Sequence, residues 1–431
     1  MSYADFLTTK RRRAGQHGIE IDPDGLHPIL HDHQRHGVAW AAKVGRAAMF
    51  WDCGMGKTLA QLEWARTVAD TSLVLAPLSV ARQTVREASM IDLDAKYVRD
   101  PAEVTGGGVY VTNYEMAERF DPAMFGAVVL DESSILKNVD GRTRQTLTDL
   151  YRDVPYRLAC SATPAPNDVS ELTNHAEFLG AMARNEMLAA YFINDGKSWR
   201  MKGHASGAMF EWMATWAQAA RRPSDLGFSD DGYELPPLHI EAEYVKAEIT
   251  PGEGQLFAAD LGGVSGRSKV RRQTMDARVE RAAELADDGN QWIIWTGLNP
   301  EADACAKAID GAVNVEGSWT PEAKAEALEA FQDGELRVLV TKPKIAGFGM
   351  NFQNCSRMAF VGLSDSYEAY YQAVRRCWRF GQTDPVYAHI VLSEIESQIA
   401  SNVRRKENES ARMVESLVRQ MRDTQLVEVA A

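Results

Sequence analysis

The sequence predicts an α/β protein with two successive domains, each built on a parallel β-sheet. Its 431 residues exceed the size at which a single hydrophobic core stops growing, so two or more domains are expected. Short, continuous apolar runs alternate with segments of helical spacing, and this alternation occurs twice along the chain. Strands buried on both faces have such continuous apolar runs, which favours parallel sheets covered by helices.

The first alternation predicts one domain and the segment that follows it. We expect helices at 56–70, 79–88 and 143–154 between its strands. From about 168 to 235 the chain is rich in Ala, Met and Trp, and we expect it to be helical. The predicted strands are 46–51, 72–77, 108–113, 127–132 and 156–163.

The second alternation begins after a boundary that we place near Pro236 and Pro237. A polar, charged segment of helical spacing ends the chain. The predicted strands are 291–296, 312–317, 336–342, 357–363 and 386–392. The resulting map is an N-terminal tail 1–23, domain one 24–180, a helical connecting segment 181–236, domain two 237–393 and a C-terminal helix 394–431.

Composition and charge narrow the function classes. With 45% hydrophobic and 25% charged residues, the chain is typical of globular proteins. A net charge of −13 excludes a chain coated in basic surface, so a nucleic-acid site would be a local basic groove. The five cysteines are scattered without a C-x-x-C pair, as expected of reduced thiols in a cytosolic compartment. No run of about 18 apolar residues occurs, so no membrane interaction is predicted.

The stretch DCGMGKT, directly after the first predicted strand, indicates a phosphate-binding loop. Backbone N–H groups of a glycine loop at a strand-to-helix junction can bind phosphate oxygens, the lysine can reach the terminal phosphates, and the threonine hydroxyl can bind Mg²⁺. Trp51 stands where the full motif has its first glycine. The residues expected to bind ATP are Gly54, Met55, Gly56, Lys57 and Thr58, with Thr58 also a ligand of Mg²⁺.

The stretch GAVVLDESSILKN places two acids, Asp131 and Glu132, at the end of a buried strand. Burying carboxylates is costly unless a cation or hydrogen-bond donors meet them, so the pair is either a turn reaching solvent or half of a metal site. A phosphate-loop ATPase needs an acid for Mg²⁺ and a group that orients the attacking water. We assign Asp131 to the Mg²⁺ ion and Glu132 to the water.

Several further segments occur in the order found in one family. From about 24 to 392 the chain resembles the superfamily 2 helicase-like ATPases, and within them the Swi/Snf-type DNA translocases, especially compact phage and bacterial members. The segments that carry the resemblance are LHDHQRHGVAW (30–40), DCGMGKT, LAPLSV (75–80), VTNYEM (111–116), LDESSILKN, CSATPAPND (160–168), KIAGFGMNFQNC (344–355) and QAVRRCWRFGQ (372–382).

The resemblance implies two tandem RecA-like domains that use ATP and Mg²⁺ and act on nucleic acid. It implies that Gln34 reads the adenine, that Gly349 and Gln372 also contact the nucleotide, and that Lys137 and Asn138 fit the acidic motif. The residues it implies for nucleic-acid contact are Pro77, Ser79, Thr112, Asn113, Ser161, Thr163, Thr341 and Asn351.

Arg376 and Arg379 belong to the most discriminating segment. Their spacing of three means that on a helix both project from one face and can reach one target. Forked, permanently charged guanidinium groups suit the charge that develops on a transferred phosphoryl group, so both are assigned to catalysis. Ser134 departs from the family, which usually has histidine there, so coupling of hydrolysis to nucleic acid is less certain than hydrolysis.

The function predicted is ATP-driven translocation on DNA in the cytoplasm of a bacterium or a phage-infected host, with duplex DNA favoured over single strands or RNA and no protein partner assigned. The alternatives are a strand-separating DNA or RNA helicase and an ATP-gated clamp that does not travel.

Three other features of the sequence have more than one interpretation. The histidines between 27 and 36 could bind metal but are assigned to the adenine segment. The basic stretch 266–281 could line a nucleic-acid groove, or it could be a solvated helix face or an interdomain linker. Trp199, Trp212 and Trp216 are expected in the core rather than stacking on bases.

Overall fold

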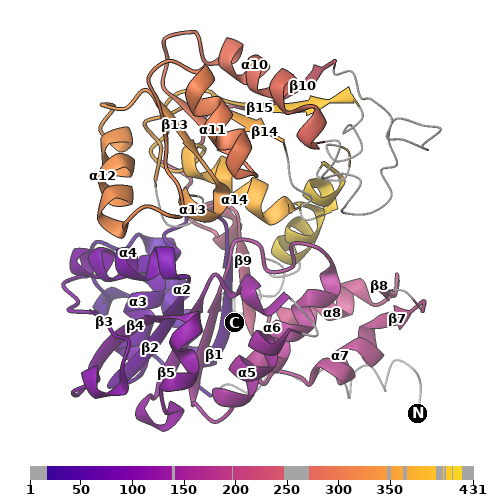
Figure 1. Cartoon of the computed structure of the whole chain (residues 1–431). Helices are drawn as coiled ribbons and strands as arrows, with labels where there is room; N and C mark the ends of the chain where they lie inside the picture. Colours follow the sequence, from indigo (N-terminus) through magenta and orange to yellow (C-terminus); the bar gives the residue numbers. More distant parts are fainter. Residues whose placement is uncertain are drawn as a thin grey trace. The chain divides into compact units, whose positions relative to one another are not determined.

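The computed structural model of the chain divides into two compact units, which are described separately (Figure 1). The first unit includes the chain up to Tyr233 and again from Glu409, and the second is Glu234–Asn408. The structure describes residues 17–137, 141–196, 198–246, 271–346, 351–362, 366–394, 401, 404–409 and 411–419. The domain boundaries given above stay predictions.

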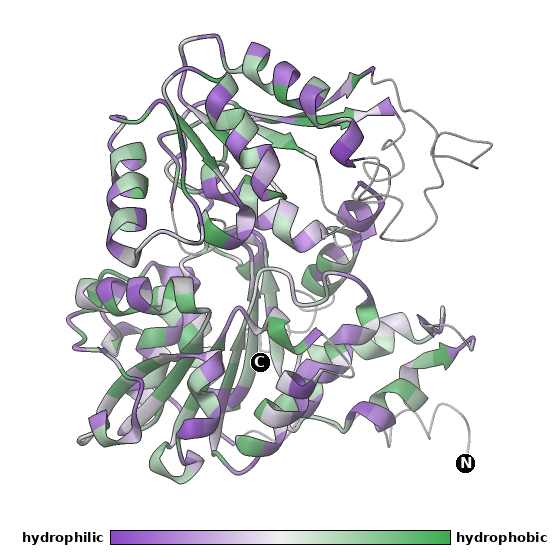
Figure 2. Cartoon of the chain, viewed as in Figure 1, coloured by the Kyte–Doolittle hydropathy of each residue, from purple (hydrophilic) through white to green (hydrophobic). Residues whose placement is uncertain are grey.

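The first unit contains a seven-stranded sheet in the order β3-β4-β2-β5-β6-β1-β9, in which all neighbours are parallel. Almost every strand residue is buried, because apolar runs of this kind require cover on both faces (Figure 2). All five strands predicted for this part of the chain are confirmed. The strands are β1 (Arg46–Trp51), β2 (Thr71–Ala76), β3 (Lys96–Tyr97), β4 (Gly108–Asn113), β5 (Ala127–Asp131), β6 (Tyr156–Cys160) and β9 (Ala217–Ala220).

Helices cover this sheet, and the three predicted between its strands are confirmed. The helix after β1 begins directly behind Gly56, whose left-handed backbone (φ 75°) turns the chain from loop to helix. The helices are α2 (Asp32–Val44), α3 (Lys57–Val68), α4 (Leu78–Ala88), α5 (Arg142–Leu150), α6 (Leu172–Leu179), α7 (Arg184–Tyr191) and α8 (Ser206–Met213).

The segment 168–235 is not wholly helical, so that prediction is wrong in part. Besides α6 to α8 it contains an antiparallel pair, β7 (Phe192–Asn194) and β8 (Trp199–Met201), and the edge strand β9. The sequence AQAA of β9 has little strand propensity; its parallel pairing with β1 and its complete burial decide its conformation. The expectation for the tryptophans is confirmed, since Trp212 and Trp216 are buried and Trp199 packs against the same core.

The second unit contains a six-stranded parallel sheet in the order β10-β15-β14-β11-β13-β12. The five predicted strands are present, and β10 is an additional edge strand whose alternating exposure hid it among polar residues. The strands are β10 (Leu238–Val245), β11 (Trp292–Thr296), β12 (Ala312–Asn314), β13 (Val338–Thr341), β14 (Arg357–Val361) and β15 (Val386–Ser393), and the helices are α10 (Met275–Leu285), α11 (Asn299–Ala308), α12 (Pro321–Gln332), α13 (Pro343–Ala346) and α14 (Tyr367–Cys377).

The C-terminal segment is helical at 404–409 and 411–419. Met413, Leu417 and Val418 are buried in the apolar core of the first unit, so the chain returns to that unit after completing the second. All five cysteines are free, as predicted for reduced thiols. No helix among the described residues is long and apolar enough to cross a membrane.

A buried ion network holds the second unit together. The Glu301 carboxylate accepts two hydrogen bonds from Arg271, at 2.8 and 2.9 Å, and further ones from Arg278 at 3.1 Å. Glu301 and Arg278 are completely buried. Arg271, Arg278 and Arg281, in the described part of 266–281, all form ion pairs within the unit. Residues 266–270 lie outside the described residues.

Replacing Glu301→Gln should lower the free energy of unfolding of the second unit by about 3 kcal/mol, because it leaves the buried Arg278 guanidinium without its counter-charge. Urea unfolding followed by circular dichroism measures the change. The matched control is Glu280→Gln, an exposed acid of α10, for which a change below about 0.5 kcal/mol is expected. Equal midpoints for the two variants would contradict a stabilising role for the network.

Candidate functional site

The motif residues of the first unit follow the carboxyl ends of its parallel strands. The glycine loop follows β1, Pro77 follows β2 and Glu132 follows β5. Asn113 closes β4, and Ser161 follows β6. Since parallel strands end at the same edge of the sheet, segments far apart in the sequence meet there, where ligands bind in open α/β sheets.

Two glycines give the loop its shape. Gly54 (φ 88°) and Gly56 (φ 75°) are both left-handed, a conformation that side chains disfavour. A Cβ atom on Gly56 would lie 1.8 Å from Nε2 of Gln34, so a larger residue would displace the Gln34 side chain and adopt a strained backbone. The loop ends at the N-terminus of α3, where free backbone N–H groups and the helix dipole favour an anion.

The Lys57 ammonium lies across the loop. Its Nζ atom donates to the carbonyl oxygens of Trp51 at 2.8 Å and Asp52 at 3.1 Å. Trp51, which stands in place of a glycine, is completely buried, and its indole N–H donates to Oε1 of Gln218 on β9 at 3.0 Å. The departure from the full motif is thus accommodated by a partner on an unpredicted strand.

Gln34 connects α2 to the loop. Its Oε1 accepts from the backbone N–H of His31 at 2.8 Å, and its Nε2 donates to the Met55 carbonyl at 3.2 Å. The Nε2 atom of His33 lies 3.2 Å from the same carbonyl. Burial lowers the pKa of His33 to about 4, so its ring is neutral at pH 7. The adenine segment and the loop therefore form one connected structure.

The predicted histidine cluster lies among aromatic rings. The His31 and His33 rings contact the ring of Tyr233, with centroids 5.5 and 5.1 Å apart. His36 packs on Phe228, and Nε2 of His27 lies 3.1 Å from a carboxylate oxygen of Asp92. These histidines form no metal-ligating group with the other residues that the structure describes.

Asp131 is a buried carboxyl group at the end of β5. Burial raises its pKa to about 7, the charge of Glu132 adds to the rise, and the nearby Gln61 side chain and the charge of Lys57 oppose it. A carboxylate that is costly to ionise in this environment is suited to a bound cation. The acids at the strand end thus lie beside the phosphate-loop lysine, as the metal-site interpretation requires.

Glu132 has an unusual backbone. Its φ of 54° is left-handed, which a residue with a long side chain adopts only where the surrounding structure imposes it. Strain of this kind is concentrated at functional sites, and here it sits directly beside Asp131. Because of this backbone turn, the Glu132 side chain no longer follows the alternating directions of the side chains along β5.

A histidine approaches the acidic motif from elsewhere in the chain. Nε2 of His175, on α6, lies 3.1 Å from Oγ of Ser133, and its ring contacts Phe50 at 5.2 Å. Burial lowers the pKa of His175 to about 4, so the imidazole is neutral at pH 7. The motif that lacks its usual histidine at Ser134 therefore has an imidazole beside Ser133. Neither His175 nor Gln61, which lies beside Asp131, was identified from the sequence, because no local pattern connects them to the motif.

The hydroxyls predicted for nucleic-acid contact are mostly engaged inside the protein. Thr112 donates to the Val98 carbonyl at 2.7 Å and Thr341 to the Val315 carbonyl at 3.1 Å. Ser161 accepts from the backbone N–H of Thr163 at 3.0 Å, and both residues are buried. Asn113 is buried and accepts from the Tyr97 hydroxyl, whereas Pro77 is partly exposed at the start of α4. The structure does not describe the side chain of Ser79. The nucleic-acid contacts of all these residues stay predictions.

In the second unit, the arginine motif does not lie on one helix, which corrects the expectation. The helix α14 ends at Cys377, and Trp378 leaves it with its indole N–H donating to the Pro236 carbonyl at 2.7 Å. Arg379 lies beyond that turn.

Both arginines are linked to the preceding motif. Arg376 donates to Gln372 at 3.2 Å and its carbonyl accepts from the backbone N–H of Phe352 at 2.8 Å. Arg379 donates to the side chain of Asn351. The structure thus brings four predicted site residues together. Gly349 and Asn138 lie outside the described residues.

Comparison with known proteins gives one family match. Residues 279–381 match the helicase conserved C-terminal domain. This match, the two parallel sheets and the glycine loop agree with the resemblance to the superfamily 2 helicase-like ATPases. The relatives to which the chain is similar include SWI/SNF-related proteins.

The curated relatives come from animals and are longer than this chain. One is the SWI/SNF-related matrix-associated actin-dependent regulator of chromatin subfamily A-like protein 1 of Drosophila melanogaster, 22% identical over 84% of this chain and 52% of its own length. Another is the DNA annealing helicase and endonuclease ZRANB3 of Mus musculus, 20% identical over 87% of this chain and 40% of its own length. The Sulfolobus solfataricus SWI2/SNF2 ATPase core in complex with dsDNA matches with a TM-score of 0.45 and 17% identity, covering 92% of this chain and 99% of that one. The chain spans about half the length of these curated relatives.

The raised pKa of Asp131 predicts how stability depends on pH. Between about pH 4 and pH 7 the folded protein holds a proton on Asp131 that the unfolded chain has released, so this group destabilises the fold progressively as pH rises. Asp131→Asn should therefore stabilise the nucleotide-free protein by up to about 4 kcal/mol above pH 7, with little effect near pH 4. Urea unfolding in a chelator at both pH values measures this.

The control is Asp94→Asn, an exposed acid of the same unit, for which no pH-dependent gain is expected. An equal gain for Asp131→Asn at both pH values would contradict the assignment of the titrating group.

Proposed function

We propose that the chain is a nucleic-acid-dependent ATPase that uses hydrolysis to translocate on duplex DNA. The observation that carries the proposal is the buried Asp131, whose raised pKa reflects burial, at the edge of the sheet beside Lys57 and the glycine loop. A phosphate-binding loop and a carboxyl group suited to a cation, at the ends of two strands of one parallel sheet, are what Mg²⁺-ATP requires.

The first unit's residues fit this nucleotide. The left-handed glycines present backbone N–H groups at the start of α3, and the Lys57 ammonium can exchange its two carbonyl partners for phosphate oxygens. Thr58 follows at the helix start, where its hydroxyl can join Asp131 as a ligand of Mg²⁺. Bound Mg²⁺-ATP supplies the phosphoryl group and the charge that the site neutralises.

The remaining roles follow from position and chemistry. Glu132, turned out of the strand by its left-handed backbone, is assigned to orienting the attacking water. Gln34 is assigned to the adenine and links α2 to the loop through Met55. Arg376 and Arg379 are assigned to stabilising the charge of the transferred phosphoryl group, because guanidinium groups suit that charge. Their action on a nucleotide held by the first unit rests on the family resemblance.

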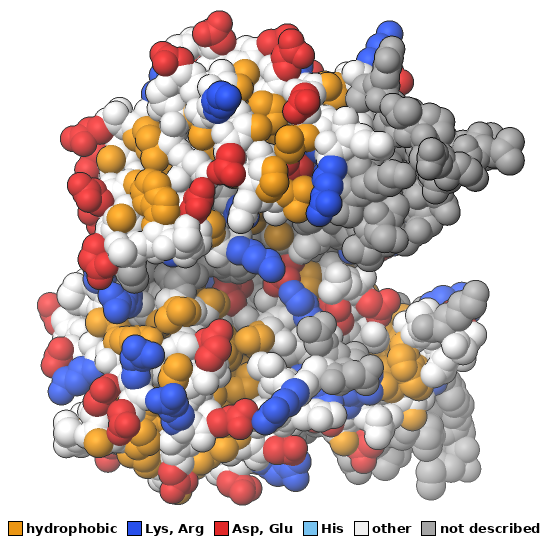
Figure 3. Space-filling view, viewed as in Figure 1, with side chains coloured by type: hydrophobic (Ala, Val, Ile, Leu, Met, Phe, Trp, Pro, Cys, Tyr) orange, Lys and Arg blue, Asp and Glu red, His pale blue; other side chains and the backbone are white. Residues whose placement is uncertain are grey.

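Duplex DNA is the favoured track. The variants of the acidic and arginine motifs resemble the Swi/Snf type, and one relative, ZRANB3, is a DNA annealing helicase and endonuclease. Acidic and basic side chains are interspersed on the face shown in Figure 3, and the net charge of the chain is −13. A site for the phosphates of DNA would therefore be local. A cytoplasmic location in a bacterium or an infected host, and the compact phage or bacterial type, are part of the same proposal.

The activating nucleic acid tests the proposal. ATP turnover should rise at least about tenfold with duplex DNA and less with single-stranded DNA or RNA, and a DNA triplex should be displaced in an ATP-dependent way. Lys57→Ala and Glu132→Gln, as the inactive controls, should lower turnover at least about a hundredfold. Unwinding of a tailed duplex would instead indicate a helicase, and ATP-dependent retention on DNA without turnover would indicate a clamp. If no nucleic acid stimulated ATP turnover, the proposal of a motor would be wrong.

Arg379 provides a separate test of the second unit. Arg379→Ala should lower the rate of ATP hydrolysis at least about a hundredfold while leaving the dissociation constant of ATP within about threefold, because the guanidinium acts on developing charge. Equilibrium binding and steady-state rates measure the two quantities. Lys307→Ala, an exposed cation of α11, is the control and should change neither. Loss of ATP binding in Arg379→Ala would contradict the catalytic assignment.

A further inference from the structure

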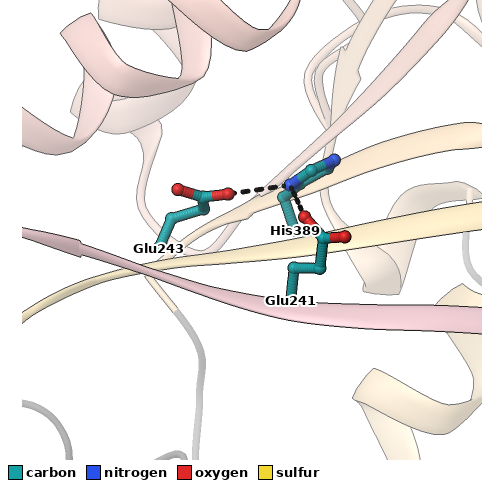
Figure 4. A group of neighbouring side chains, drawn as sticks. All are labelled: Glu241, Glu243 and His389. Carbon is teal, nitrogen blue, oxygen red and sulfur yellow. Dashed lines mark hydrogen bonds and ion pairs between the residues drawn. The ribbon is translucent and has the colours of Figure 1, made fainter.

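Three side chains that the proposed ATPase does not use gather on one face of the second sheet (Figure 4). Glu241 and Glu243 lie on the edge strand β10, and His389 lies on its neighbour β15. Side chains alternate along a strand, so residues 241 and 243 point to the same face. In the parallel register of the two strands, His389 is the direct partner of Glu241.

The separations of their polar atoms match those around a single metal ion. Nδ1 of His389 lies 3.1 Å from Oε1 of Glu243 and 3.5 Å from Oε2 of Glu241, and the three atoms all lie within 4.8 Å of one another. With metal–ligand bonds of about 2.0–2.2 Å, ligand atoms around a tetrahedral zinc ion are about 3.4 Å apart. An ion could therefore bind all three without movement of the strands.

Neighbouring residues orient two of these ligands. The Arg281 guanidinium donates to Oε2 of Glu243, at 3.1 Å from Nη2, which leaves Oε1 directed at His389. Arg281 is itself held by Glu284 at 2.7 Å. The His389 ring packs against Trp292, with centroids 5.6 Å apart. Support of this kind fixes the direction of metal ligands in proteins.

We propose that Glu241, Glu243 and His389 bind a divalent transition-metal ion such as Zn²⁺. Imidazole nitrogen favours this class of metal over Mg²⁺ and Ca²⁺, which prefer ligand sets made only of oxygen. The side chain of Glu241 is 51% exposed and that of His389 is 11% exposed, so an ion can enter from solvent and keep a water ligand.

The ion joins the edge strand β10 to β15. Two carboxylates on one face of an edge strand repel each other, and only Glu243 has an arginine partner among the described side chains. A divalent cation neutralises both carboxylates and connects two strands that are otherwise joined by backbone hydrogen bonds. The site thus stabilises the edge of the second sheet, and it is independent of the proposed ATPase.

Metal titration of the full-length chain tests the proposal. The protein is stripped with a chelator, kept free of nucleotide so that the phosphate-loop site does not compete, and titrated with Co²⁺ and Zn²⁺ at pH 7.5. The wild type should bind one equivalent of Co²⁺ with weak visible bands of nitrogen and oxygen ligands, without the intense ultraviolet band of thiolate ligands. Calorimetry with Zn²⁺ gives the affinity.

Glu241→Gln removes one ligand with no change in size at a half-exposed position. It should weaken Zn²⁺ binding at least about tenfold and abolish the rise in melting temperature that Zn²⁺ gives the wild type. Glu280→Gln, an exposed acid of α10 that lies outside the three ligands and their supporting residues, is the matched control and should bind like the wild type.

Three results would overturn the proposal. They are no saturable binding at micromolar Zn²⁺, equal binding by Glu241→Gln and the wild type, and a thiolate band, which would locate the ion at cysteine. In the first case the group is only a histidine hydrogen-bonded to acids. Far-ultraviolet circular dichroism of each variant establishes that it is folded, so that loss of binding reports the site.

Discussion

The burial of the Asp131 carboxyl group is the constraint on which the first unit's site depends. Between β5, which carries it, and β1, which leads into the glycine loop, lies one strand, β6. Neighbouring strands are about 4.8 Å apart, so the two strand ends are about 10 Å apart, a distance that an aspartate and a lysine span together. The charge of Lys57 does reach Asp131, but burial and Glu132 outweigh it. The site is thus short of positive charge, which the proposed Mg²⁺ ion would supply.

The loop beside this acid is held by contacts outside its own motif. Trp51 takes the place of a glycine, and the structure accommodates it through Gln218 on β9 and through Gly37, where a Cβ atom would lie 2.2 Å from the indole ring. Gln34 and His33 both bond to the Met55 carbonyl from α2. The backbone of the loop is therefore fixed from three directions, and its glycines remain in the conformation that turns N–H groups toward an anion.

Local patterns were sufficient to predict most of this framework. Continuous apolar runs identified β1 and β4 to the residue, because strands buried on both faces have no other composition. Glycines before a lysine and acids after an apolar run identified the loop and Asp131. The strand β9 escaped prediction because Ala and Gln carry no strand signal, and β10 because it is half exposed. His175 and Gln61 were not predicted because only the fold brings them close to the acids. The end of α14 at Cys377 was not predicted because it depends on the hydrogen bond from the Trp378 indole to the Pro236 carbonyl.

In the second unit, the arginines divide into two groups with different partners. Arg271, Arg278 and Arg281 pair with acids of their own unit, which neutralises them. Arg376 and Arg379 donate hydrogen bonds to Gln372 and Asn351, two other residues predicted for the site. The backbone N–H of Phe352 donates to the Arg376 carbonyl, and the Asn351 side chain accepts from Arg379. Hydrogen bonds therefore connect the segment at 351–352 to both arginine positions, and they are a direct physical link between the two motifs.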